Sequence, residues 1–193
     1  MIKSLSLLIK LLLMLHILII SGCEGNSSKY KTIQGQDILL DAEKRLKEFD
    51  IQLRNPAPPV ANFVHAVRSG NLVFLAGHGP LMTDGTWMIG KVGRDIDLEE
   101  GKKAARLTAI NLLSSLKAEI DDLNKVKRIV KVLGMVNSDE SFTDQPQVMN
   151  GCSDLLVSVF GDRGKHARSA VGMTSLPFGI PVEIEMIVEV EDR

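Results

Sequence analysis

The amino-acid sequence predicts a single α+β domain with the element order β-β-α-β-α-β-β, in which two helices pack on one face of a mixed sheet. Two observations support this prediction. Two segments of helical length, 97–120 and 144–160, place apolar side chains at helical spacing. Short apolar runs precede, separate and follow them, and the last run alternates strictly between apolar and mostly acidic residues, as a half-buried strand does.

The first two predicted strands form a hairpin. They cover 60–67 and 72–76, and a Ser-Gly-Asn turn joins them. The glycines in 77–80 allow the backbone to turn sharply after the second strand. A glycine-punctuated loop or short strand, 83–92, comes next. It contains Trp87, which is a candidate pocket wall or subunit contact, with local packing as the alternative.

The helix boundaries follow from capping residues. Asp97 can cap the first long helix, and Glu100 has the spacing of a capping box. A strand at 126–136 should separate this helix from the second one. The second helix opens at Asp144 and stops at Gly161, because glycine favours a helix C-terminus.

The two C-terminal strands carry the most informative pattern. One strand places Arg168 on the same face as Ala170 and Gly172, so that only small side chains flank the guanidinium. The last strand has an apolar face and a second face formed by Glu183, Glu185, Ile187, Glu189 and Glu191. A guanidinium beside open space suits an anion pocket, whereas a simple ion pair between Arg168 and a surface glutamate is equally compatible with the pattern.

The N-terminus has the features of a targeting segment. Lys3 and Lys10 supply positive charge, the run 11–20 is apolar, and it is too short for a permanent membrane span. The sequence before Cys23 resembles a bacterial lipobox, and this resemblance implies that Cys23 is acylated and becomes the mature N-terminus. An uncleaved anchor and a misassigned start codon are the alternatives.

These features divide the chain into four parts. We predict a lipoprotein signal peptide at 1–22, a tether at 23–36, a helix with a Pro-rich linker at 37–59, and the α+β domain at 60–193. The predicted protein is exported and lipid-anchored to a bacterial membrane, on the periplasmic side or at the cell surface. Its only membrane contact is then the lipid anchor.

Charge, cysteine content and histidine spacing reduce the range of possible functions. Cleavage after residue 22 removes two of the 23 basic residues and none of the 24 acidic ones, which leaves a net charge of −3. This argues against a nucleic-acid partner, for which a basic patch is expected. Cys152 would be the single remaining thiol and is expected to be a small buried hydrophobe. The histidines His65, His78 and His166 lack the spacing of metal ligands.

Several motifs in a fixed order resemble the YjgF/Rid family, also catalogued as L-PSP endoribonucleases. They are the turn Leu75-Ala76-Gly77-His78-Gly79-Pro80, the helix from Glu99, the strand 126–136, Val148-Met149-Asn150, Ala167-Arg168-Ser169 with Leu176-Pro177, and Val182-Glu183-Ile184-Glu185. The resemblance covers 60–191 and implies a chorismate-mutase-like fold. Longer runs such as 90–93 and 166–172 are similar to the branch labelled as endoribonuclease.

The resemblance also implies a site. Members form homotrimers with pockets in the clefts between subunits. In the deaminases, the arginine matching Arg168 holds the carboxylate of a 2-imino or 2-enamino acid, and the glutamate matching Glu185 orients the attacking water. Asn150 and Gly77 are expected near this pocket, which requires no metal or organic cofactor.

Two positions depart from the deaminase pattern. Phe63 stands where deaminases carry a tyrosine, so it can pack in the pocket but lacks the hydroxyl, and Ala170 stands where a cysteine is frequent. We therefore expect an imine or enamine deaminase first. A non-catalytic protein that binds a small carboxylate is the second hypothesis. The third is an endoribonuclease, which would need an acid–base pair and phosphate contacts that Arg168 alone does not supply.

Overall fold

The computed structural model describes residues 40–59 and 61–192, all within the compact unit Leu39–Arg193. The predicted signal peptide, Cys23 and the tether lie outside the described residues, as do the first residues of the predicted helix at 37–49. Within the described ranges, no helix combines the length and apolar character needed to cross a membrane.

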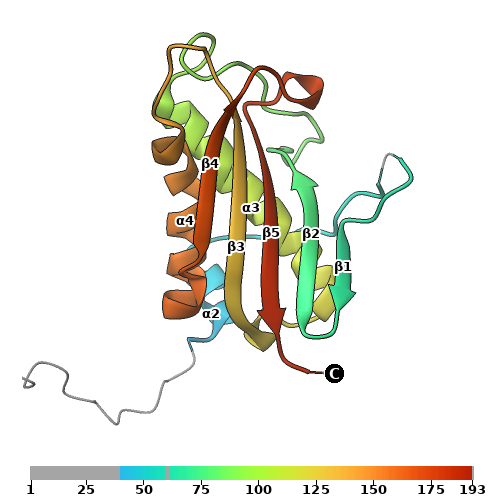
Figure 1. Cartoon of the computed structure of the whole chain (residues 1–193). Helices are drawn as coiled ribbons and strands as arrows, with labels where there is room; N and C mark the ends of the chain where they lie inside the picture. Colours follow the sequence, from blue (N-terminus) through green and yellow to red (C-terminus); the bar gives the residue numbers. More distant parts are fainter. Residues whose placement is uncertain (1–39, 60, 193) are drawn as a thin grey trace, which may run out of the picture. The chain divides into compact units, whose positions relative to one another are not determined.

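One five-stranded mixed sheet forms the centre of the domain (Figure 1). Its strands lie in the order β1-β2-β5-β3-β4, where β3 and β4 run parallel and every other neighbouring pair is antiparallel. The bounds are β1 Ala66–Ser69, β2 Leu72–His78, β3 Val126–Asn137, β4 Ala167–Met173 and β5 Val182–Val190. The predicted fold class and element order are therefore confirmed.

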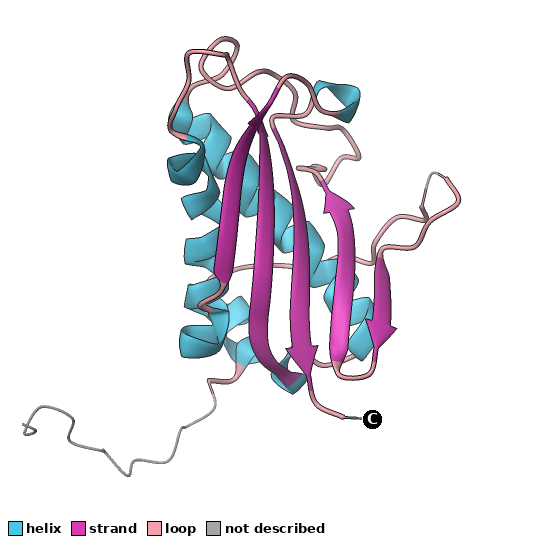
Figure 2. Cartoon of the chain, viewed as in Figure 1, coloured by secondary structure: helices cyan, strands magenta, loops and turns pink. Residues whose placement is uncertain are grey.

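Two long helices, α3 (Leu98–Ile120) and α4 (Gln145–Phe160), cover one face of the sheet (Figure 2). Asp97 and Glu100 form the expected capping box at the start of α3, and Gly161 follows the last residue of α4. The apolar face of β5 is fully buried against these helices, as its alternation predicts. This packing leaves the acidic face of β5 on the opposite side of the sheet.

The first strand differs from the prediction of 60–67. It begins only at Ala66, and residues 61–65 form no strand. Phe63 donates its backbone N–H to Ala61, which is a local bond of a bent chain instead of a sheet bond. The second strand continues to His78, with an irregular register between Leu75 and His78. Gly77 and His78, at this irregular end of β2, line a pocket.

The N-terminal helix α2 (Ala42–Glu48) packs on the domain. Its Glu43 carboxylate contacts Lys117 Nζ at 2.6 Å and accepts the backbone N–H of Leu123 at 3.2 Å. Arg45 donates to the carbonyl of Ser158 on α4 at 3.0 Å. Residues 37–59 therefore include a docked part of the domain.

The second face of the sheet carries exposed apolar side chains. Val67, Phe74 and Val171 are 54%, 42% and 42% exposed, although each lies in a strand. No described helix packs on this face (Figure 2). A sheet face with this many exposed apolar groups is typical of a surface that meets another protein.

Candidate functional site

The predicted site residues fall into two groups at different places in the sheet order. Arg168 lies on the edge strand β4 and contacts Asn150 of α4. Gly77 and Phe63 line a pocket at the end of β2, which lies beyond β5 and β3 from β4. Glu185 lies on the open face of the sheet and is exposed. One chain therefore does not bring all these residues together.

Arg168 belongs to a hydrogen-bonded cluster, called the arginine cluster below. Its Nη1 donates to Asn150 Oδ1 at 2.9 Å and to Ser153 Oγ at 3.0 Å. Ser153 Oγ lies 3.1 Å from His166 Nε2, and His166 Nδ1 lies 2.7 Å from the carbonyl of Gly164. Neither open space nor a surface glutamate therefore surrounds the Nη1 group.

The protonation of this cluster follows from its bonds. His166 Nδ1 donates to a carbonyl, so in the neutral ring Nε2 accepts the hydroxyl hydrogen of Ser153. Burial lowers the pKa of His166 and favours that neutral form. The hydrogen bonds of Arg168 to Asn150 and Ser153 both use Nη1, so that Nε and Nη2 can meet a carboxylate bidentately.

Ser153 was not predicted as a site residue, although its spacing from Asn150 could have indicated it. It lies three residues after Asn150, which places both side chains on one face of a helix. Cys152 between them is fully buried, as predicted, and burial raises the pKa of its thiol to about 12. This thiol is therefore not a nucleophile at neutral pH.

The second group lines a cavity of about 480 Å³, called the aromatic pocket below. Its walls come from the segment after α2, the end of β2, the loop before α3 and the loop before β5. Side chains or backbone of Pro56, Phe63, Gly77, Trp87, Phe178 and Glu183 are among the lining. The structure thus places Phe63, Gly77 and Trp87, each a candidate pocket residue from the sequence, in the lining of one cavity.

Glu183, and not Glu185, meets Gly77. A Cβ atom at Gly77 would lie 2.0 Å from Glu183 Oε1, so the carboxyl group rests directly against the glycine backbone. Burial, together with the neighbouring Glu185 charge, raises the pKa of Glu183. A half-buried carboxyl with a raised pKa suits proton transfer. Alternation could not separate these two glutamates, because both lie on the same face of β5.

His78 is the buried last residue of β2, and its ring borders the aromatic pocket. Its Nδ1 lies 2.7 Å from the carbonyl of Ala76, and its Nε2 lies 2.7 Å from Ser115 Oγ on α3. Burial is the main cause that lowers the pKa of His78, and the nearby His65 adds to the effect. The neutral ring therefore fixes the end of β2 to α3 behind Gly77.

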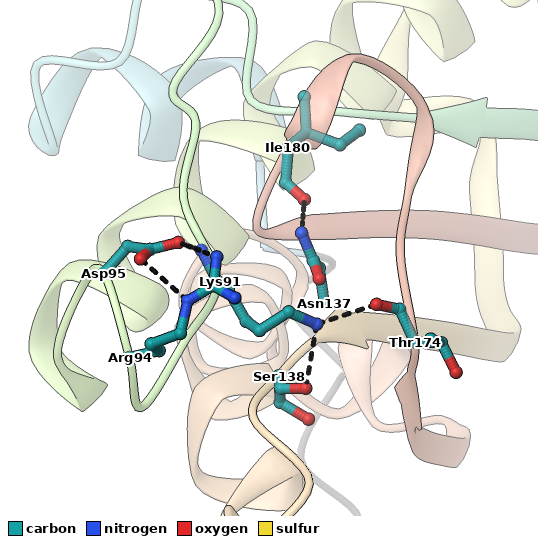
Figure 3. A network of polar contacts seen from close by, with 7 residues as sticks. All are labelled: Lys91, Arg94, Asp95, Asn137, Ser138, Thr174 and Ile180. Atoms are coloured by element: carbon teal, nitrogen blue, oxygen red, sulfur yellow. Dashed lines mark hydrogen bonds and ion pairs between the residues drawn. The ribbon is translucent and has the colours of Figure 1, made fainter.

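Two loops form the outer wall of the pocket. The rings of Trp87 and Phe178 stack at a centroid distance of 5.9 Å and an angle of 6°. Figure 3 shows how Lys91 of the first loop is joined to Thr174 of the second. Lys91 Nζ donates to the carbonyls of Thr174 and Ser138 at 2.7 and 3.2 Å. Asn137 donates to the carbonyl of Ile180 at 3.2 Å, which fixes the loop that carries Phe178.

Within residues 40–59 and 61–192, no three His, Cys, Asp or Glu side chains lie together so that they could hold a metal ion. The arginine cluster and the aromatic pocket differ in chemical character. The first offers an anion site, and the second offers an apolar cavity with one carboxyl group.

Comparisons with known proteins agree with the fold. Residues 43–188 match the family described as "YjgF/chorismate mutase-like, putative endoribonuclease". The chain is similar to Protein TCP17 of Trypanosoma cruzi, with 43% identity over 148 residues that cover 76% of this chain and 92% of that protein.

Two solved structures are also similar. The protein Atu1372 of Agrobacterium tumefaciens, whose function is described as unknown, has 42% identity and a TM-score of 0.72, with 78% of this chain and 94% of that chain covered. A Shewanella oneidensis protein described as a putative endoribonuclease has 27% identity and a TM-score of 0.74, with 77% and 99% covered.

Proposed function

Because the chain belongs to the YjgF/chorismate mutase-like family, we propose that it is a Rid-type hydrolytic deaminase of reactive 2-imino and 2-enamino acids. One observation carries this proposal. The arginine cluster supplies a carboxylate site, and the aromatic pocket supplies a proton-transferring carboxyl group, but the two lie on separate parts of one chain. Each is half of the site that the reaction needs.

We propose that the halves meet between subunits of a homotrimer. The exposed Val67, Phe74 and Val171 on the open sheet face support self-association, because burial of such side chains stabilises an interface. Phe74→Glu should then shift the sedimentation of the purified protein from trimer to monomer. A wild-type protein that sediments as a monomer at all concentrations would contradict the trimer.

In the proposed reaction, Arg168 of one subunit binds the substrate carboxylate through Nε and Nη2. A water oxygen adds to the C=N carbon, and the Glu183 carboxylate of the adjoining subunit accepts a proton from that water. The resulting carbinolamine receives the proton on nitrogen. Its C–N bond then breaks as the C=O bond forms and the hydroxyl proton passes to the Glu183 carboxylate, which releases ammonia and a 2-keto acid.

The test is imine hydrolysis by a purified fragment that begins near Ser27 and lacks the proposed lipid anchor. A threonine dehydratase generates 2-iminobutyrate in the cuvette, and its decay is followed with and without the protein. We expect acceleration by the wild type, loss of it in Arg168→Ala, and retention in Arg106→Ala, which removes an exposed arginine of α3. A folded wild type that gives no acceleration would instead favour a carboxylate-binding protein without catalysis.

We also propose that the protein is exported and anchored through an acylated Cys23. The lysines, the apolar run and the lipobox-like sequence before Cys23 support this proposal. Expression in a Gram-negative bacterium should place the protein in the detergent phase of a Triton X-114 extract. Cys23→Ser should abolish labelling by a palmitate analogue, and equal labelling of both forms would refute acylation at this residue.

A further inference from the structure

We infer that the aromatic pocket selects substrates with a large apolar side chain, an aromatic ring above all, over those with three- or four-carbon skeletons. This inference rests on the proposed function, because it names the substrate class of the same site. It is carried by the size of the pocket, by the ring stack in its wall and by the backbone conformation of Phe178.

The pocket is far larger than a small imino acid requires. Its volume is about 480 Å³, within the range of ligand pockets. The ethyl group of 2-iminobutyrate would fill only roughly 60 Å³, if each carbon takes the ~30 Å³ share of a water molecule. Phe63, Trp87 and Phe178 would then keep much of their ring surface out of contact with the substrate. A phenyl or branched aliphatic group would cover it.

Phe178 occupies an unfavourable backbone conformation. Its φ of 58° lies in the left-handed region, which glycine or asparagine adopts at lower cost than an aromatic residue. The ring is 68% exposed, so burial within the chain does not compensate for this cost. Its stack on Trp87 is the contact that the conformation produces, and strain of this kind is frequent at ligand sites.

Other contacts hold the wall in place without a ligand. Gly90 donates to the carbonyl of Gly179 at 2.9 Å, next to the bonds of Lys91 and Asn137. On the opposite side, Arg54 donates to the carbonyls of Leu81 and Met82 at 2.9 and 2.8 Å. The cavity is thus preformed, and its apolar surface favours an apolar occupant without a large ordering cost.

The activity test compares 2-imino acids that an L-amino-acid oxidase generates from phenylalanine, leucine and alanine. We expect the kcat/KM of the wild-type protein to be at least about tenfold higher for the first two than for the alanine product. Phe178→Asn should reduce this preference without lowering the thermal midpoint, because asparagine tolerates the left-handed conformation. Phe49→Asn, which removes an exposed ring outside the pocket, should retain the preference.

A binding test separates this inference from the proposed function. Trp87 is the single tryptophan, so its fluorescence reports occupancy of the pocket directly. We expect 3-phenylpropionate to bind at least about tenfold more tightly than propionate. This preference without any imine hydrolysis would refute the deaminase and leave the ligand class standing. Hydrolysis of all three imines at equal kcat/KM, with equal binding of both acids, would overturn the inference.

Discussion

At the scale of single residues, the proposed reaction depends on which carboxyl group lies against Gly77. Glu183 occupies that place, where a side chain on residue 77 would collide with its Oε1 atom. Half-burial raises the pKa of Glu183, whereas Glu185 is exposed on the sheet. Gly77 is therefore required by the close approach of a carboxyl group, and its own φ is not in the left-handed region.

Gly77→Ala should displace the Glu183 carboxyl group and leave the fold intact, because the obstructing atom is the end of a flexible side chain. A displacement of about 1 Å at a catalytic group can cost roughly 100-fold in rate. We expect a loss of this order in imine hydrolysis, with a circular dichroism spectrum like that of the wild type. Wild-type turnover by the alanine variant would remove Glu183 from the mechanism.

The buried His78 predicts a loss of stability in acid. Its pKa in the folded chain lies below the ordinary 6.5, so between these two values the unfolded chain binds more protons. The stability contributed by the neutral ring is complete above pH 6.5 and declines as the pH falls below it. From about pH 7.5 to about pH 5.5, the thermal midpoint should fall further in the wild type than in His78→Gln. Equal falls would show that His78 does not carry this dependence.

At the scale of elements, the sequence predicted regular strands and helices well. The two long helices and the alternating β5 are confirmed. Each buries one face, and this burial spaces the apolar residues at the period of a helix or a strand. Residues 61–65 have a strand-like composition but leave the sheet, because Phe63 and His65 border the aromatic pocket. Local pattern cannot distinguish burial in a sheet from burial in a pocket wall.

Helix α2 offers a test of docking by paired substitutions. Glu43 bonds to Lys117 and to the backbone of Leu123, so Glu43→Ala should lower the free energy of unfolding by about 1 kcal/mol or more. Glu48 of the same helix makes only exposed pairs with Lys44 and Arg45, so Glu48→Ala should cost less than about 0.5 kcal/mol. Equal costs in urea titrations would argue against docking through Glu43.

At the scale of the whole molecule, the strand order separates the two halves of the candidate site. Arg168 on the edge strand β4 and Gly77 on β2 have β3 and β5 between them. Only the family resemblance predicted that both residues share one pocket. Hydrophobic periodicity identifies strands and their buried faces, but it does not give the order of the strands in a sheet. The hydrogen bond between Arg168 and Asn150 likewise could not be predicted from local pattern, because it depends on how α4 packs on β4.

The most direct test of an assembled site is complementation between two inactive variants. Arg168→Ala and Glu183→Gln are refolded together with different affinity tags, and mixed trimers are isolated and assayed for imine hydrolysis. If one subunit supplies Arg168 and the next supplies Glu183, every mixed trimer has both groups in one of its three sites, and activity returns to about one third of wild type. Mixed trimers that remain as inactive as either parent would contradict a site shared between subunits.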